Sequence, residues 1–381
     1  MTGDERRAAF LPFAQELAEL VPAGTAVVDA HTHLGTDEDG RSQELAALLE
    51  QLDTVGARSR ACVFALHDPD RHPAYSKPND RVLAWAAESE GRLLPYCRLD
   101  PDEDPVEEAE RCLARGAKGI KLHPRAQAFV FEHVAAERIF EVARAAAVPI
   151  LIHAGRGMGP MDALADLALR FPDVTVVLAH AGIAGQGMFA SRLAEHPAVL
   201  YDTSAFSAFD VLELFARVPA ERIVFASDSP YGHPLPSLYM AMRAAARAGV
   251  DAGGRAMIAG GTMAAVLDGE ELPVPTEPRL EQVRHVNGRL LRINGYLMMA
   301  AGAALTVEPP DLRRAQEGVA LARYACRDPE PGEAGGALAR VDAALAVAEE
   351  IVADGAASDG DANLAIGLAV AAAAVAATEP V

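Results

Sequence analysis

Short apolar runs alternate with longer stretches of helical periodicity along most of the chain. Eight runs have the length and the β-branched composition of buried strands, at residues 26–30, 60–66, 93–99, 119–122, 149–153, 175–180, 199–202 and 223–227. Apolar residues at helical spacing follow them over 42–55, 79–90, 105–115, 133–146, 161–171 and 235–248. Strands that are apolar throughout are typical of a parallel sheet covered by helices. The pattern therefore predicts an α/β fold.

Polar residues of ligand type stand where four of these strands end. His31 and His33 close the first strand, His153 the fifth, His180 the sixth and Asp228 the eighth. In a (β/α)8 TIM barrel the carboxyl ends of all strands face one mouth, so these side chains would converge. In an open doubly wound sheet the first and last strands need not meet. The positions therefore favour a closed barrel.

The composition changes after the last predicted strand and helix. Residues 1–25 are expected to form an N-terminal helix and residues 26–270 the barrel, with a proline-rich linker over 271–278. Helical patterns over 280–305, 311–326, 336–354 and 361–377 predict an all-helical C-terminal domain at 279–381. These helices could cap the barrel mouth or join subunits of a homo-oligomer. The alanine-rich stretch 364–378 is too short for a membrane span and is expected to be a buried helix.

Charge and cysteine usage narrow the class of protein. The chain has 381 residues, 51% of them hydrophobic, and a formal net charge of -20. Like-charge repulsion argues against nucleic acid or an anionic membrane as a partner, which leaves a small-molecule substrate. The four cysteines show no Cys-x-x-Cys spacing and the N-terminus has no signal-peptide pattern, so a cytoplasmic location is expected.

The histidines and the aspartate suit a metal ion. Alternate residues of a strand share a face, so His31 and His33 can point into one site. Imidazole nitrogen and carboxylate oxygen are ligands of Zn²⁺, with Mn²⁺, Fe²⁺ or Co²⁺ as alternatives. A single His-x-His pair could equally be structural. The further ligand types at other strand ends favour one divalent ion per chain.

The same residues carry a resemblance to a known family. His31-Thr32-His33, His153-Ala154-Gly155, His180-Ala181-Gly182 and Ser227-Asp228-Ser229-Pro230 resemble the motifs of the amidohydrolase superfamily. The resemblance is to its amidohydrolase-related (amidohydrolase 2) branch of metal-dependent hydrolases and decarboxylases, over residues 26–267. It implies that His31, His33, His153 and Asp228 bind the ion and that Asp228 takes a proton from bound water. It also implies that His180 donates a hydrogen bond to the substrate, with a fourth histidine ligand as the alternative.

Further candidates lie on the fourth strand and in the loops at the mouth. Lys121 and His123 share one strand face and are expected to contact the substrate. In binuclear members of the superfamily a lysine on this strand is carboxylated and bridges two ions. The alternative for Lys121 is a buried ammonium paired with an acid such as Asp29 or Asp228. Arg125 and Arg156 could clamp a substrate carboxylate or could be ordinary surface residues.

These expectations lead to one function with two alternatives. The first is a metal-dependent hydrolase that uses a metal-activated water on a small amide, ester or lactone. A non-oxidative decarboxylase of the same family would need the same residues. A non-catalytic barrel scaffold is the third alternative, and the complete ligand set argues against it.

Overall fold

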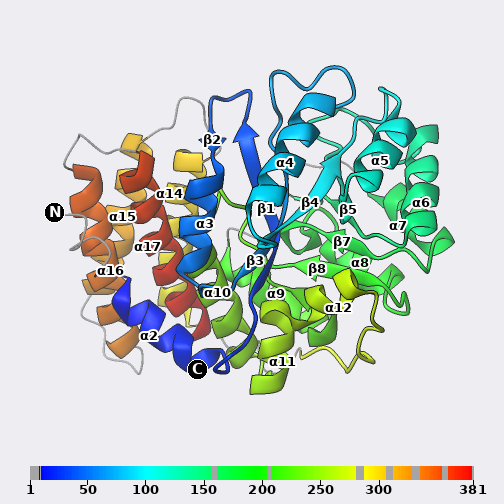
Figure 1. The fold of residues 1–381 in the computed structure, drawn as a ribbon. Helices are drawn as coiled ribbons and strands as arrows, with labels where there is room; N and C mark the ends of the chain where they lie inside the picture. Colours follow the sequence, from blue (N-terminus) through cyan, green and yellow to red (C-terminus); the bar gives the residue numbers. More distant parts are fainter. Residues whose placement is uncertain are drawn as a thin grey trace.

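A curled, mostly parallel sheet forms the centre of the computed structural model (Figure 1). The structure describes residues 8, 10–155, 161–204, 207–279, 287–305, 312–327, 335–353 and 359–379. The strands follow the order β2-β1-β3-β4-β5-β6-β7-β8-β9. They are β1 (Val28–Thr36), β2 (Ser42–Gln43), β3 (Arg60–Ala65), β4 (Leu93–Arg98), β5 (Gly119–Leu122), β6 (Ile150–Ile152), β7 (Val176–Leu178), β8 (Val199–Asp202) and β9 (Ile223–Val224). The predicted α/β class is confirmed.

Hydrogen bonds connect the first strand to the residues that follow the last one. The backbone N–H of Ala30 donates to the carbonyl of Phe225 at 2.9 Å, and that of Asp228 donates to the carbonyl of His31 at 2.8 Å. Thr32 also forms a parallel bridge with Ser229. The segment after β9 therefore lies beside the carboxyl end of β1, although the two are far apart in sequence.

One strand was not expected. The sequence predicts a helix from residue 42, but Ser42 and Gln43 pair antiparallel with the end of β1, and α3 begins only at Leu45. The Gln43 side chain donates to the carbonyl of His33 at 2.7 Å, which gives this turn a partner on β1. The predicted helix is therefore confirmed only for the second part of the segment. A tertiary contact with β1 makes the first part a strand instead.

Helices cover the outside of the sheet and follow the strands in sequence. Most strand residues are buried, which explains why β3 to β9 are mainly apolar, whereas β1 carries buried polar residues such as Asp29, His31 and His33. Two 3-10 turns, η1 and η2, and a π-helical segment, η3, complete the connections. The helices are α3 (Leu45–Asp53), α4 (Ser76–Glu88), α5 (Pro105–Ala114), α6 (Val134–Ala146), α7 (Asp162–Arg170), α8 (Gln186–Arg192), α9 (Ala208–Arg217), α10 (Pro234–Arg247), α11 (Ala252–Ala256) and α12 (Thr262–Asp268), and the turns are η1 (His180–Gly182), η2 (Ala220–Arg222) and η3 (Met257–Gly261).

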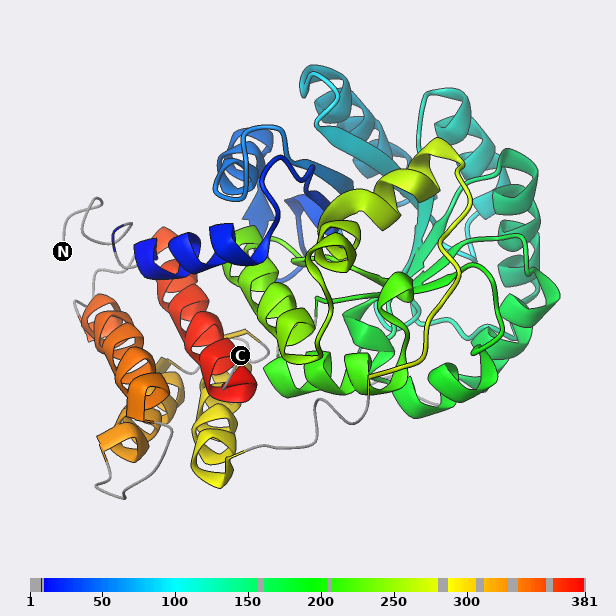
Figure 2. The same ribbon diagram turned by 90° about the horizontal axis from the view of Figure 1, so that it is seen from below.

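Four C-terminal helices pack against one side of this sheet-and-helix body. They are α14 (Gly288–Leu305), α15 (Leu312–Arg327), α16 (Gly335–Ala353) and α17 (Asp359–Thr378). α17 lies along α10 and also contacts α9, and the N-terminal helix α2 (Leu11–Leu20) lies beside α10 (Figure 2). Leu368 and Val375 of α17 are fully buried, as expected for the alanine-rich stretch. Among the described residues, no helix has the length and hydropathy that a membrane span would require.

A polar cluster connects α2, α10 and α17. The Arg243 side chain is 1% exposed and forms ion pairs with Glu16 and Glu379, the latter at 3.0 Å. Its Nε donates to the hydroxyl of Thr378 at 2.7 Å, and Glu16 also accepts from the hydroxyl of Tyr239 at 2.6 Å. A buried guanidinium with this many partners fixes the three helices in one arrangement.

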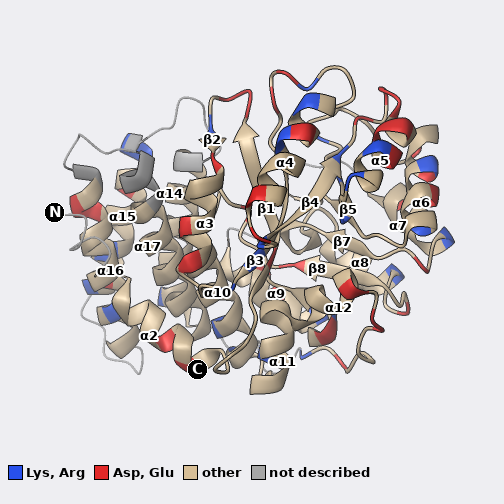
Figure 3. Ribbon diagram, viewed as in Figure 1, with Lys and Arg blue, Asp and Glu red and all other residues tan. Residues whose placement is uncertain are grey.

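Charged side chains are concentrated on the outer helices. Figure 3 shows acidic and basic residues interspersed along α5 and α6, whereas the strands are mostly uncharged. Ion pairs such as Arg111 with Asp80 and Arg170 with Glu137 link neighbouring outer elements. The few charges at the centre of the sheet are therefore unusual, and they lie together.

Candidate metal centre

The carboxyl half of β1 carries two buried histidines. His31 is 1% exposed and His33 is 4% exposed, and their ring centroids are 5.2 Å apart. The pairing of β1 with β3 changes register between Asp29 and Thr32, at the start of this segment. Both rings also pack against the ring of Phe64, which holds them in place. As predicted from the alternation of a strand, the two imidazoles occupy one region.

Asp228 lies between these two rings. Its Oδ1 is 3.1 Å from Nε2 of His31 and 3.1 Å from Nε2 of His33. Asp228 has a backbone φ of 59°, a conformation that non-glycine residues rarely adopt. The bond from its N–H to the His31 carbonyl holds this turn against β1. The carboxylate of Asp228, which follows the eighth predicted strand, therefore lies beside the histidines of the first.

Asp202 at the end of β8 is a site residue that the sequence analysis did not single out. Its Oδ2 is 2.9 Å from Nδ1 of His31, and its Oδ1 accepts from the backbone N–H of His180 at 2.8 Å. The carboxylate therefore places the His31 proton on Nδ1 and leaves Nε2 as a lone pair facing Asp228. The one sequence feature that could have identified Asp202 as a site residue is its position, because it also ends a predicted strand.

His180 follows β7 in the turn η1, with a backbone φ of 58°. Its Nδ1 is 3.2 Å from the carbonyl of Ser204, which can only accept, so this nitrogen carries the proton. Its Nε2 is then an acceptor and lies 2.9 Å from Nδ1 of His153. This arrangement suits an ion ligand better than the hydrogen-bond donor expected from the sequence.

His153 and His123 complete the group of histidines. Their rings are stacked with centroids 3.8 Å apart, and His153 is partly exposed. Nε2 of His153 is buried and has no hydrogen-bond partner among the described residues, and the same is true of Nδ1 of His33. Unpartnered buried nitrogens are costly, and a ligand or ion is one way to satisfy them.

The donor set fits a divalent ion. One ligand atom from each of His31, His180 and Asp228 lies within 4.8 Å of the others, and all three residues are buried. His33 and His153 border this group but do not belong to it at that distance. Of the four ligands that the resemblance implies, His31 and Asp228 are thus members of this group, and His180 is its third member.

Burial and neighbouring charges set the protonation of the group. Burial lowers the pKa of His31 well below its usual value, and the Lys121 charge adds to this shift. Burial likewise lowers the pKa of His33 and His153. For Asp228 burial raises the pKa, but the facing His31, His33 and His180 outweigh it and lower the value to about 2. Neutral imidazoles beside an ionised carboxylate are the forms that bind metal ions.

Lys121 on β5 reaches the same group. It is fully buried, and its Nζ lies 3.4 Å from Nε2 of His31 and 4.6 Å from the ring centroid of Phe64. Burial lowers the pKa of Lys121 to about 7, against the attraction of Asp228. Asp29, one partner considered for it, instead accepts the backbone N–H groups of His31 and Ser227.

The arginines near the strand ends differ in burial and in whether the structure describes them. Arg125 is exposed beyond β5, and Arg156 lies outside the described residues. Arg98, at the end of β4, is only 1% exposed and donates to the carbonyl of Ala65 at 3.0 Å. Its Nε is buried and has no hydrogen-bond partner among the described residues. Arg98 therefore brings a buried positive charge to the mouth side of the sheet.

Changing Asp202 tests whether its carboxylate orients the His31 ring. In Asp202→Asn, the amide oxygen is expected to keep the backbone donors of His180 and Ser204, which turns the NH₂ group toward Nδ1 of His31. His31 would then carry its proton on Nε2 and lose the lone pair that faces Asp228. We expect metal affinity to fall about 10- to 100-fold, measured by competition with a chelating dye.

Ser204→Ala is the comparison variant, because it removes a hydroxyl that donates to Asp202 at 2.6 Å and lies 3.1 Å from Nδ1 of His180, but keeps the Asp202 carboxylate at Nδ1 of His31. It should change the affinity for the ion by much less. Equal affinities for the wild type and Asp202→Asn would contradict the orienting role.

The candidate site lies in the part of the chain that matches a known protein family. The amidohydrolase family model matches residues 28–268, whereas no curated protein matches the chain. Solved structures with similar folds include 2,6-dihydroxybenzoate decarboxylase in complex with 2,6-dihydroxybenzoate, at 16% identity and a TM-score of 0.49, over 64% of this chain and 99% of that one. A probable 2-pyrone-4,6-dicarboxylic acid hydrolase from Acinetobacter baumannii with citric acid bound has 14% identity and a TM-score of 0.48, over 64% and 99%. Because the family match spans well over half of its residues, the chain belongs to the amidohydrolase family, a family of enzymes.

Proposed function

We propose that the chain is a metal-dependent hydrolase acting on a small amide, ester or lactone. The observation that carries the proposal is the buried group of His31, His180 and Asp228 at the carboxyl ends of the strands. We take the bonds between β1 and the residues after β9 to close the sheet into a (β/α)8 barrel, whose mouth is the usual place for an active site.

We assign one divalent ion to this group, with Zn²⁺ as the first choice and Mn²⁺, Fe²⁺ or Co²⁺ as alternatives. His31 and Asp228 are its central ligands. His180 is favoured by distance, whereas His33 and His153, which the family resemblance implies, are adjacent and keep an unpartnered nitrogen. When bound, such an ion supplies positive charge that polarises a substrate oxygen and lowers the pKa of water.

Each side chain of the site then has its own role in hydrolysis. Asp228 is ionised and accepts the proton of the attacking water, then returns it to the leaving group. Asp202 holds His31 and the backbone of His180 in place. Lys121 lies next to His31 and His123 stacks on His153, and both are proposed to contact the substrate. The exposed Arg125 is proposed as a further candidate, as is Arg156, which lies outside the described residues.

Metal analysis and isotope labelling test this function. We expect about one divalent ion per chain in the purified protein and a large loss of it in His31→Ala, because an incomplete ligand set loses affinity. With a panel of amides, esters and lactones, reaction in ¹⁸O-labelled water should place the label in the product.

Other outcomes of the same experiment would replace the proposal. Release of CO₂ from an aromatic acid without incorporation of the label would assign the decarboxylase alternative. Two ions per chain together with a modified Lys121 would contradict the single-ion centre, and a protein that binds no ion would favour the scaffold.

A further inference from the structure

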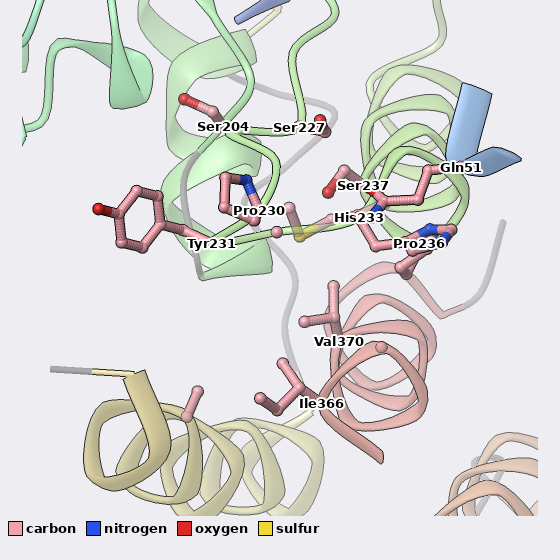
Figure 4. Close-up of a pocket in the computed structure, with 14 residues that line it drawn as sticks. Gln51, Ser204, Ser227, Pro230, Tyr231, His233, Pro236, Ser237, Ile366 and Val370 are labelled. Carbon is pink, nitrogen blue, oxygen red and sulfur yellow. The ribbon is translucent and has the colours of Figure 1, made fainter. Parts of the chain in front are cut away.

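A cavity lies between the strand ends and the C-terminal helices (Figure 4). Ser204, Ser227 and Tyr231 line it on the side of the sheet. Ile366 and Val370 of α17 and Ala301 of α14 line the opposite side. The empty space is about 600 Å³, and this volume includes the part that is open to solvent.

The inner wall of this cavity borders the metal centre, although His31, His180 and Asp228 are not among its lining residues. The carbonyl of Ser204 accepts from Nδ1 of His180, and Ser227 directly precedes Asp228. The Tyr231 ring packs edge-on against His33 with centroids 5.8 Å apart. A molecule in the cavity would therefore lie beside the residues proposed to hold the ion.

The lining is uncharged. None of the fourteen lining residues is Asp, Glu, Lys or Arg, although 23% of the chain is charged. Burial lowers the pKa of His233, the one lining histidine, to about 4, so it is neutral near pH 7. Pro236 and Met240 of α10 add apolar surface beside Ile366 and Val370. An uncharged and largely apolar wall excludes ionic groups and favours hydrocarbon.

The outer wall comes from a part of the chain that the family match does not include. The match ends at residue 268, whereas Ala301, Ile366 and Val370 lie beyond it. The Arg243 cluster and the packing of α17 along α10 hold this wall against the rest of the fold. The C-terminal helices therefore contribute directly to a cavity beside the candidate active site.

We propose that this cavity is a substrate subsite that binds an uncharged alkyl or aryl group, while the polar reacting group of the same substrate lies at the metal centre. The C-terminal helices then select substrates by the size of their apolar part. The position of the reacting group at the metal centre rests on the proposed function. The subsite itself can be tested by binding alone.

Calorimetric titration of the full-length protein with butanoate, hexanoate and octanoate tests the subsite without turnover. Affinity should rise about fourfold for each added methylene that enters the cavity. In Ala301→Phe and Val370→Phe, which narrow the cavity from two different helices, octanoate should bind at least tenfold more weakly while butanoate changes less than twofold. Leu291→Phe is the matched control, since Leu291 is a 52% exposed residue of α14 outside the cavity and should leave all three affinities unchanged.

The outcomes separate the subsite from the enzymatic activity. Affinity that does not depend on chain length, or chain-length dependence that is the same in both cavity variants and in the wild type, would overturn the subsite. If the expected binding pattern is found in a protein that hydrolyses no amide, ester or lactone, the subsite stands and the proposed hydrolase is wrong.

Discussion

Asp228→Asn is expected to reduce turnover by about a hundredfold or more, the usual contribution of a general base, while most of the ion is retained. Asparagine keeps the size of the side chain and one oxygen near Nε2 of His31 and His33. It cannot accept a proton, whereas the carboxylate, with its pKa of about 2, is ionised and available across the neutral range. The measurement is kcat on the best substrate of the panel, with the ion content determined on the same sample.

Asp39→Asn is the control for this change. Asp39 is an exposed acid in the loop between β1 and β2. Among its described contacts, its carboxylate accepts only from the backbone N–H of Arg41, at 2.9 Å. The turnover of Asp39→Asn should therefore match that of the wild type. Near-normal turnover in Asp228→Asn with the ion bound would exclude the proton-accepting role, and His180 would then be the next residue to test.

Arg243→Ala is expected to lower the free energy of unfolding by about 3 kcal/mol, because it leaves Glu16 and Glu379 without their shared buried partner. The two carboxylates are 21% and 25% exposed, so water offsets part of the loss and the effect should lie at the lower end for broken buried pairs. The midpoint of urea unfolding, followed by circular dichroism, measures this change.

Arg340→Ala is the matched comparison for Arg243→Ala. Arg340 also pairs with Glu16 but is 41% exposed, so its loss should cost less than about 1 kcal/mol. If the two variants unfold at the same urea concentration, the cluster does not hold α2, α10 and α17 together in the way that the structure indicates.

The sequence was sufficient for the strands and for most of the site. A strand buried on both faces is mainly apolar, so the eight parallel strands left a visible pattern, although β1 also carries the buried Asp29, His31 and His33. Parallel strands also present their carboxyl ends at one edge. The convergence of His31, His153, His180 and Asp228 could therefore be predicted from their places at strand ends.

The sequence did not determine the roles within the site. β7 ends at Leu178, and His180 adopts a left-handed turn conformation because Asp202 and Ser204 bind its backbone and ring. These contacts fix which nitrogen of His180 carries the proton, and they depend on a strand about twenty residues further along the chain. Asp202 had the same position at a strand end as the other candidates, but a carboxylate that acts through a histidine has no motif of its own.

The sequence by itself therefore determined the class of fold, the family and most of the residues that gather at the strand ends, but not Asp202. The tertiary structure decided which donors come closest, how each imidazole is oriented and where the C-terminal helices lie. Helical periodicity shows that a helix has an apolar face, but the partner of that face is selected by shape and burial across the whole molecule. Only the packing of α17 along α10 could place Ile366 and Val370 in one cavity with Ser204 and Tyr231.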